Sequence, residues 1–269
     1  PAIIIVGKVC ALAKDFCWFD KRPLHGEKIL VTRPKERAGT LSDKLRALGA
    51  DVVEYPCIET VPIVPCPEME RALGQIQAYQ WLVFTSPAGV EAFWDCLRGM
   101  GKDARHLGAV RLAAIGSGTA RALAGHGLTA DLIPSVYDAA HLGAELAEQA
   151  DGRVLILRAE IGSPALTEAL EKGNMSYDDI PVYRTVYENP RSEELRRMLE
   201  DGKVTYVTFT SASTVKGFVS SVGEEADFSK ITGLCIGEQT AAEARKHGIA
   251  VRIAQKATID ALVDLALAL

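Results

Sequence analysis

The sequence has no paired-cysteine motif and no long apolar run, and these two gaps exclude several classes of protein. Its six cysteines include no Cys-x-x-Cys pair and its five histidines show no ligand spacing, so we expect neither a metal site nor a dithiol redox site. No stretch reaches the roughly 18 apolar residues of a membrane-spanning helix. We therefore expect a cytoplasmic protein with reduced thiols and no membrane partner.

A surplus of basic residues is also missing. The 30 Lys and Arg residues are outnumbered by 35 Asp and Glu residues, which gives a formal net charge of -5. Nucleic acids and anionic membrane surfaces are bound through basic patches that displace counterions, so neither partner is expected. An anionic small ligand remains compatible with this charge, because helix ends supply local positive potential.

The first residues carry neither a starting Met nor the basic region and cleavage site of a signal peptide. Pro1 is followed at once by an apolar run, so we predict that residues 2–9 form a β-strand without a partner in the rest of the chain. We interpret the chain as a fragment of a longer protein. Its 269 residues, 48% of them hydrophobic, suffice for two globular lobes at about 150 residues per domain.

An internal repeat is the most informative feature of the sequence. The matched segments are Arg33 with Arg158, residues 84–86 with 209–211, and residues 115–116 with 236–237. The first two pairs are 125 positions apart and the third is 121 positions apart. The chain after residue 26 therefore consists of two related halves.

Each half alternates strands with helices. A helical period runs from Ala38 to Leu48, and apolar runs typical of buried strands occupy residues 29–32, 52–55, 81–84 and 204–209. This alternation predicts an α/β fold of two lobes, each with a doubly wound parallel sheet. Ligands bind such sheets beyond the carboxyl ends of the strands, where the repeated Thr-Ser and Ile-Gly segments lie.

The Thr-Ser segments are the first candidates for ligand binding. They place hydroxyls and backbone N–H groups where a strand turns into a helix, an arrangement that attracts anions. The candidate residues are Thr85, Ser86 and Gly89 in one half and Thr210, Ser211 and Ser213 in the other. N-capping alone explains one such segment more simply, but its repetition at one offset favours a ligand held by both lobes.

The Ile-Gly segments are the second candidates. Gly116 and Thr119, with their equivalents Gly237 and Thr240, follow predicted strands. A glycine there lets the backbone approach a ligand closely, and a tight turn is the alternative. The first segment partly matches the dinucleotide-binding GxGxxG pattern, but Arg121 stands in place of the third glycine, so we exclude that cofactor site.

Three further side chains could act on a ligand. Arg33 and Arg158 end matching strands and could bind carboxylates as bidentate donors, or they could form structural ion pairs. Tyr183 lies near a predicted crossing between the lobes, where a phenol could donate a proton. A tyrosine packed in a linker is the alternative.

A series of short motifs runs through the chain in fixed order. It comprises Ile29-Leu30-Val31-Thr32-Arg33-Pro34, Tyr55-Pro56-Cys57-Ile58-Glu59, Phe84-Thr85-Ser86-Pro87, Ala114-Ile115-Gly116, Val182-Tyr183-Arg184-Thr185, Phe209-Thr210-Ser211 and Cys235-Ile236-Gly237. Together these motifs resemble the uroporphyrinogen-III synthase family from about Leu24 to Leu269. Residues 1–23 resemble the tail of a uroporphyrinogen-III C-methyltransferase, which implies a fused upstream methyltransferase domain.

The resemblance also implies an architecture and a reaction. Residues 24–61 and 185–269 would form lobe 1 and residues 62–184 lobe 2, joined by a two-stranded connector. The family cyclises hydroxymethylbilane to uroporphyrinogen III without a cofactor or metal: it removes the substrate's hydroxyl, closes the ring through a spiro intermediate and so inverts ring D. Tyr183 matches the tyrosine proposed as the acid. Acetate and propionate groups would bind helix N-termini in an interlobe cleft.

The chain departs from some relatives at two places that bear on binding. Ala88 stands where some carry Arg, and Glu238-Gln239 replaces a Pro-Thr pair. These departures shift the expected contacts from side chains to backbone amides. Two alternatives stay open: a two-lobed binding module without chemistry, and a degenerate synthase that senses a tetrapyrrole or holds a methyltransferase dimer together.

Overall fold

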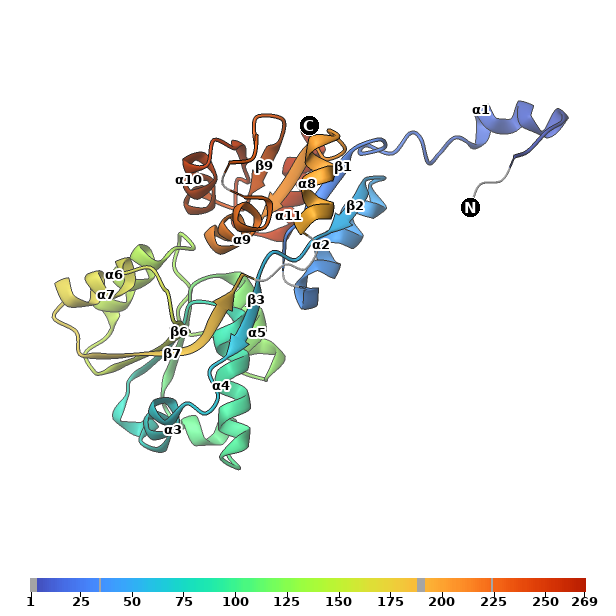
Figure 1. Ribbon diagram of the computed structural model, residues 1–269. Helices are drawn as coiled ribbons and strands as arrows, with labels where there is room; N and C mark the ends of the chain where they lie inside the picture. The colour runs from blue at the N-terminus through green and yellow to red at the C-terminus, as the bar shows by residue number, and fades with distance from the viewer. Residues whose placement is uncertain (1–3, 34, 188–191, 224) are drawn as a thin grey trace. The chain divides into compact units, whose positions relative to one another are not determined.

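The computed structural model describes residues 4–33, 35–187, 192–223 and 225–269 (Figure 1). The chain divides into two compact units, each with its own five-stranded sheet. Unit 1 comprises Pro1–Ile58 and Tyr187–Leu269, and unit 2 comprises Glu59–Val186. Unit 1 is therefore built from both ends of the chain and unit 2 from its middle.

The sheet of unit 1 is parallel throughout, with the strand order β10-β9-β8-β1-β2. Its strands are β1 (Lys28–Val31), β2 (Asp51–Glu54), β8 (Tyr206–Phe209), β9 (Thr232–Cys235) and β10 (Ala250–Ile253). Its helices are α2 (Lys35–Ala47), α8 (Ser192–Glu200), α9 (Ala212–Val222), α10 (Glu238–Lys246) and α11 (Ile259–Leu267).

Alternation of side chains along β1 explains why helices cover both faces of this sheet. Leu30 packs in one apolar cluster with Phe209, whereas Ile29 and Val31 pack in another with Leu262. All three β1 side chains are fully buried. Successive residues of a strand point to opposite faces, so an unbroken apolar run requires cover on both sides, as in parallel sheets.

Unit 2 follows the same plan, with the strand order β3-β7-β6-β4-β5. Its strands are β3 (Glu59–Pro62), β4 (Trp81–Phe84), β5 (Arg111–Ala114), β6 (Val154–Ala159) and β7 (Tyr177–Val186). Its helices are α3 (Pro67–Gly74), α4 (Pro87–Gly99), α5 (Ser117–Gly125), α6 (Ala139–Gln149) and α7 (Ala165–Lys172), with short 3-10 turns η2 (Ile76–Ala78) and η3 (Ala104–Leu107). The predicted α/β fold with parallel sheets is confirmed, except that the edge strand β3 is antiparallel to β7.

The two strands through which the chain passes between the units both belong to unit 2. β3 and β7 pair with each other from Glu59 opposite Val186 to Pro62 opposite Tyr183. The expected lobe boundaries, 61/62 and 184/185, fall inside these strands, whereas the structural division lies at 58/59 and 186/187. Backbone hydrogen bonds join β3 to β7 along their paired length, so both strands belong entirely to unit 2.

The sequence repeat places matching segments at matching positions of the two sheets. β4 and β8 are flanked by β5 and β9 on one side and by β6 and β1 on the other. Where unit 1 has β10 beside β9, unit 2 has only a single parallel bridge from Ala113 to Leu132. Strand β1, which comes from the start of the chain, thus takes the place in unit 1 that β6 takes in unit 2.

The strand predicted over residues 2–9 is wrong for the part that the structure describes. Ile4 to Val6 have no regular structure, and the chain continues as the 3-10 helix η1 (Lys8–Leu12) and the short helix α1 (Ala13–Phe16). Residues 2 and 3 lie outside the described residues. A strand needs a partner for its backbone N–H and C=O groups, and apolar side chains alone do not supply one. Ile4 and Val6 are instead 90% and 86% exposed.

Helix α9 approaches its neighbours so closely that Gly217 has no room for a side chain. A Cβ built there would lie 2.3 Å from the carbonyl oxygen of Cys57. We predict that Gly217→Ala lowers the free energy of unfolding by about 1–3 kcal/mol, because the obstacle is backbone and cannot rotate away. Chemical denaturation of both proteins measures this difference.

Gly39 is the matched control, because it lies within α2 of the same unit and is exposed, with its nearest atom 4.0 Å from a built Cβ. Gly39→Ala should raise stability by about 0.5–1 kcal/mol through its helix propensity. Equal effects of the two substitutions would contradict the close approach at Gly217.

Candidate functional site

The candidate residues gather where the strands of each sheet end. In unit 2 the turns after β4, β5 and β6 lie at the carboxyl edge of the sheet, and in unit 1 those after β8, β9 and β1 do so. Helices cover both faces of each sheet, so this edge is where an α/β fold leaves room for a ligand. Each unit therefore carries its own version of the site.

In unit 2 the Thr-Ser turn caps helix α4. The Oγ of Ser86 accepts a hydrogen bond from the Gly89 N–H at 3.1 Å, and Thr85 and Ser86 are both partly exposed. Gly89 itself is buried, and a Cβ there would lie 2.9 Å from the carbonyl oxygen of Leu157. Packing of α4 against β6 thus accounts for the glycine that we predicted to bind a ligand.

In unit 1 the equivalent turn caps helix α9. Ser211 Oγ accepts from the Thr214 N–H and Thr214 Oγ1 accepts from the Ser211 N–H, both at 3.2 Å, which forms a reciprocal capping box. The Oγ atoms of Ser211 and Ser213 are 3.0 Å apart, and Thr210, Ser211 and Ser213 are partly exposed. N-capping, the simpler of the two interpretations, is therefore present in both units.

The Ile-Gly turns lack such caps. Gly116 is the N-cap residue of α5 and Gly237 that of α10, and neither helix N-terminus has a side-chain cap hydrogen bond. The first-turn N–H groups of α5 and α10 are therefore better placed than those of α4 and α9 to bind an anion. Thr119 and Thr240 are only 3% and 4% exposed, so packing within the first turn explains them better than the predicted ligand contact.

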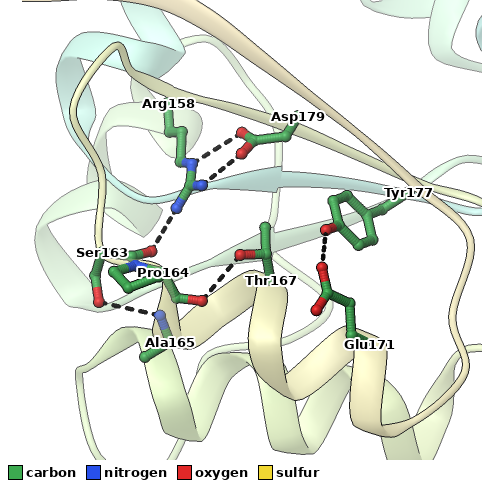
Figure 2. A network of polar contacts seen from close by, with 8 residues as sticks. All are labelled: Arg158, Ser163, Pro164, Ala165, Thr167, Glu171, Tyr177 and Asp179. Carbon is green, nitrogen blue, oxygen red and sulfur yellow. Dashed lines mark hydrogen bonds and ion pairs between the residues drawn. The ribbon is translucent and has the colours of Figure 1, made fainter.

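Arg158 is committed to an ion pair (Figure 2). Its Nε donates to Asp179 at 2.8 Å, its Nη2 donates to the other oxygen of that carboxylate, and its Nη1 donates to the carbonyl oxygen of Ser163 at 2.6 Å. The guanidinium joins β6 to β7 and to the start of α7. This geometry supports the structural ion pair over the predicted binding of a substrate carboxylate.

Arg33 stands at the matching place in unit 1, beyond the end of β1. Thr32, immediately before it, is buried and donates its hydroxyl to the Thr208 carbonyl oxygen at 2.6 Å, which ties the ends of β1 and β8 together. Arg33 is therefore held at the carboxyl edge of the sheet, as predicted from its place in the repeat. Its side chain is partly buried.

Tyr183 lies near the end of β7 and is 8% exposed. It stands opposite an irregularity in the pairing, where the register shifts between Arg158 and Ala159 of β6. Its carbonyl oxygen accepts a hydrogen bond from the Glu160 N–H at 2.9 Å. The ring belongs to the apolar core of unit 2, and its backbone is fixed at the carboxyl edge of the sheet.

The titratable groups with raised pKa values do not add nucleophiles or bases to this edge. Burial, together with the neighbouring Asp178, raises the pKa of Tyr79 to about 12, but this tyrosine precedes β4 at the opposite edge. Burial also raises the pKa of Cys235 to about 12, so the thiol at the end of β9 stays protonated. Side chains therefore offer mainly hydroxyls here.

Tyr137 is a residue that the sequence patterns did not single out. Its ring lies over Gly116, where a built Cβ would come within 2.9 Å of the ring atoms Cγ and Cδ2. By contrast, nothing lies within 4 Å of a Cβ at Gly237. The repeat carries this signal, because the matching segment of the other half, residues 253–257, contains no aromatic residue.

Neither a metal cluster nor a membrane span is found in the described part of the chain. No group of three or more His, Cys, Asp or Glu residues there is placed to hold a metal ion. Among the described helices none has the length and apolar character needed to cross a bilayer.

Comparison with known proteins points to one family. A family model described as uroporphyrinogen-III synthase HemD matches residues 39–264. The chain is 44% identical to the porphyrin biosynthesis protein HemD of Ruminiclostridium josui over 98% of its own length and 53% of that protein, so it spans about half the length of this relative. It is 30% identical to the uroporphyrinogen-III synthase of Chlorobaculum parvum, over 84% of the chain and 91% of the relative.

A solved structure shares the fold. The crystal structure of a mutant uroporphyrinogen III synthase from Thermus thermophilus aligns with a TM-score of 0.62 at 20% identity, over 89% of this chain and 96% of that one.

The ion pair of Arg158 leads to a prediction about stability. Arg158→Met and Asp179→Asn should each lower the free energy of unfolding by about 1–3 kcal/mol, because each leaves a partly buried charge or polar group unpaired. The double substitution should cost less than the sum, as expected for residues in direct contact. Denaturation of the single and double variants measures this coupling.

The pair Arg153 and Asp178, which joins the other end of the same two strands, is the control. The Arg153 side chain is 47% exposed and that of Arg158 only 11%, whereas the two aspartates, Asp178 and Asp179, are similarly exposed at 30% and 28%. Arg153→Met should therefore lower stability less than Arg158→Met does. An Arg158→Met protein of unchanged stability would restore the ligand-binding role.

Proposed function

Because the chain belongs to the uroporphyrinogen-III synthase family, we propose that it cyclises hydroxymethylbilane to uroporphyrinogen III, with loss of water and inversion of ring D. The observation that carries this proposal is the match of the family model to residues 39–264, which includes most of both halves of the repeat. The reaction needs a site for a flexible polyanion, and no redox or metal chemistry. The carboxyl edge of each sheet, taken by itself, carries helix N-termini and hydroxyls that suit carboxylates.

Backbone amides are the groups best suited to the substrate's acetate and propionate carboxylates. The N-termini of α5 and α10 carry the positive end of a helix dipole and lack a side-chain cap. The net charge of -5 is no obstacle, because these local dipoles act at short range. Glu238, which could repel a carboxylate at the start of α10, is paired with Arg245 at 2.5 Å.

Control of the substrate's shape is the main catalytic task. Uncatalysed ring closure yields the uninverted type I isomer, so the enzyme must hold the chain in a conformation that lets ring D invert through a spiro intermediate. Several fixed anion-binding points along a flexible substrate achieve this by removing its conformational freedom. Hydroxyls of Thr85, Ser86, Thr210, Ser211 and Ser213 add donors at the same edges.

Tyr183 is our candidate for the acid that assists departure of the hydroxyl. Its phenol would protonate the leaving oxygen as the azafulvene cation forms. The placement of Tyr183 at the carboxyl edge of unit 2, two strands from Ser86, supports this role. Because Tyr183 is only 8% exposed, the substrate would contact its phenol at the surface of the unit 2 core.

We extend the proposal to residues 1–23 and to the location of the protein. The exposed apolar side chains of this segment, including Ile4, Val6, Phe16 and Trp18, suit the tail of a fused methyltransferase domain. All six cysteines are free, which suits a reducing, cytoplasmic environment.

The purified chain should convert freshly made hydroxymethylbilane mainly to the type III isomer. Conversion should persist in EDTA and without nucleotides, because no step calls on a cofactor. Separation of the product isomers by chromatography gives the result. Type I product alone, formed at the rate of a protein-free control, would contradict the proposal and favour a binding module without catalysis.

Tyr183→Phe should lower turnover at the low end of the range for general acid catalysis, about 100-fold, because water can partly replace the phenol. Its melting temperature should barely change, since the ring remains. Steady-state kinetics and thermal unfolding together separate the two effects.

Tyr79→Phe is the control for this experiment. Tyr79 is similarly buried in the same unit, but its hydroxyl donates to Asp178 at the opposite edge of the sheet. It should lose stability and keep turnover. The reverse pattern at Tyr183, full turnover with a loss above about 1 kcal/mol, would make it a structural residue.

A further inference from the structure

A short apolar loop stands exposed at the carboxyl edge of unit 2. It follows Leu132, which bridges to β5, and spans residues 133–137; we call it the Tyr137 loop. Ile133, Val136 and Tyr137 are 40%, 48% and 39% exposed. Side chains of this kind are normally buried, and grouped exposure beside a binding edge indicates a surface that meets an apolar partner.

The Tyr137 loop is firmly held despite this exposure. Pro134 is buried beneath it. Ser135 donates from both its N–H and its hydroxyl to the carboxylate of Glu145 on α6, at 2.9 and 3.0 Å. Asp138 then caps α6 by accepting from the His141 N–H at 2.8 Å. The three apolar side chains are thus presented by an ordered backbone.

The ring of Tyr137 lies directly beside the uncapped N-terminus of α5. Gly116 is buried under it, and the ring atoms would be 2.9 Å from a Cβ at that position. An aromatic surface and a set of amide donors therefore meet at one point. A ligand that combines a flat apolar ring with a carboxylate on a short arm matches this pair of features.

The equivalent loop of unit 1 has a different character. Two structural matches fix the register: Leu132 bridges to Ala113 as Arg252 pairs with Leu234, and Asp138 caps α6 as Thr258 caps α11. Leu132 and Arg252 are 120 positions apart, and so are Asp138 and Thr258.

This register puts Ala257 in the place of Tyr137 and Lys256 in the place of Val136. Lys256 is exposed, and the space over Gly237 is open. The two halves have diverged at this loop, one toward an aromatic surface and the other toward a polar, cationic one.

We propose that Tyr137 is a substrate-positioning residue whose ring packs against the face of one pyrrole ring of the linear tetrapyrrole, while a carboxylate arm of that pyrrole meets the N-terminus of α5. This inference rests on the proposed function and deepens it. Aromatic contacts favour offset or edge-on packing of flat rings, which fixes the ring's plane as well as its place. The N-terminus of α10 in unit 1, where the space over Gly237 is open, has no such aromatic surface and suits carboxylates alone.

The contact at Tyr137 has a consequence for the product. A pyrrole that is anchored only by its carboxylate can still rotate, whereas one that also lies on an aromatic surface cannot. Loss of the ring should therefore weaken binding and also release part of the substrate to close without inversion.

The test compares Tyr137→Ala with Tyr137→Phe. Tyr137→Ala should raise KM for hydroxymethylbilane about tenfold and increase the share of type I product, and Tyr137→Phe should behave as the unsubstituted chain does. Val64→Ala, which removes an 82% exposed apolar side chain elsewhere in unit 2, is the control and should change neither quantity. Melting temperatures should be alike, because Tyr137 is not part of a core.

A second measurement separates failure of this inference from failure of the proposed function. Titration with uroporphyrin III, followed by its absorbance, reports binding even if the chain forms no type III product. Tyr137→Ala should weaken this binding by a similar factor. Equal KM and equal uroporphyrin III binding in Tyr137→Ala and the unsubstituted chain would overturn the inference, and so would a loss in Tyr137→Phe as large as that in Tyr137→Ala.

Discussion

Burial of the central strands on both faces is the constraint on which the rest of the molecule depends. Trp81 and Val83 of β4 face one core of unit 2, and Leu82 and Phe84 face the other. With helices on both sides, no face of either sheet is left for a ligand, and the strand ends become the place for binding. The candidate binding groups are therefore concentrated in the turns that follow the strands, whereas Tyr183 lies within β7 itself.

Within these turns, the N-termini of α4 and α9 have side-chain caps and those of α5 and α10 do not. Ser86 and Ser211 each accept a hydrogen bond from one first-turn amide, that of Gly89 in α4 and that of Thr214 in α9, which stabilises the helix and leaves one donor fewer for a ligand. Gly116 and Gly237 supply no side-chain acceptor to the first turns of α5 and α10. In α5 the Thr119 N–H donates to the Gly116 carbonyl oxygen at 3.1 Å, and a bound carboxylate would satisfy the amides that precede it. The site that we propose would tolerate side chains such as Glu238 and Gln239 at the start of α10, since its donors belong to the backbone.

The sequence predicted most of the fold because patterns in the sequence and local structure agree there. The strand at residues 81–84 was predicted at its observed bounds, and the two sheets share four strands in the same order, with β10 and β3 as the unmatched fifth strands. Contacts between distant residues were not predictable in the same way. Arg158 pairs with Asp179 on the adjacent strand β7, and the Leu157 carbonyl oxygen leaves no room for a side chain at Gly89. The strand predicted over residues 2–9 was wrong where the structure describes it, because apolar side chains do not supply the hydrogen-bonding partner that a strand requires.

The interleaving of the units also fixes the order in which the chain can mature. Unit 2 is one continuous segment and is complete once Val186 has been synthesised. Strand β1 is made far earlier, yet it must wait for β8 to supply its second neighbour, with Ile29 opposite Tyr206. On the ribosome, unit 2 can fold while β1 and β2 still present an unpaired edge, which makes that edge the point most exposed to misassembly. A chain cut short between Val186 and Tyr206 would keep unit 2 complete, but its unit 1 would consist of β1 and β2 without β8, β9 and β10.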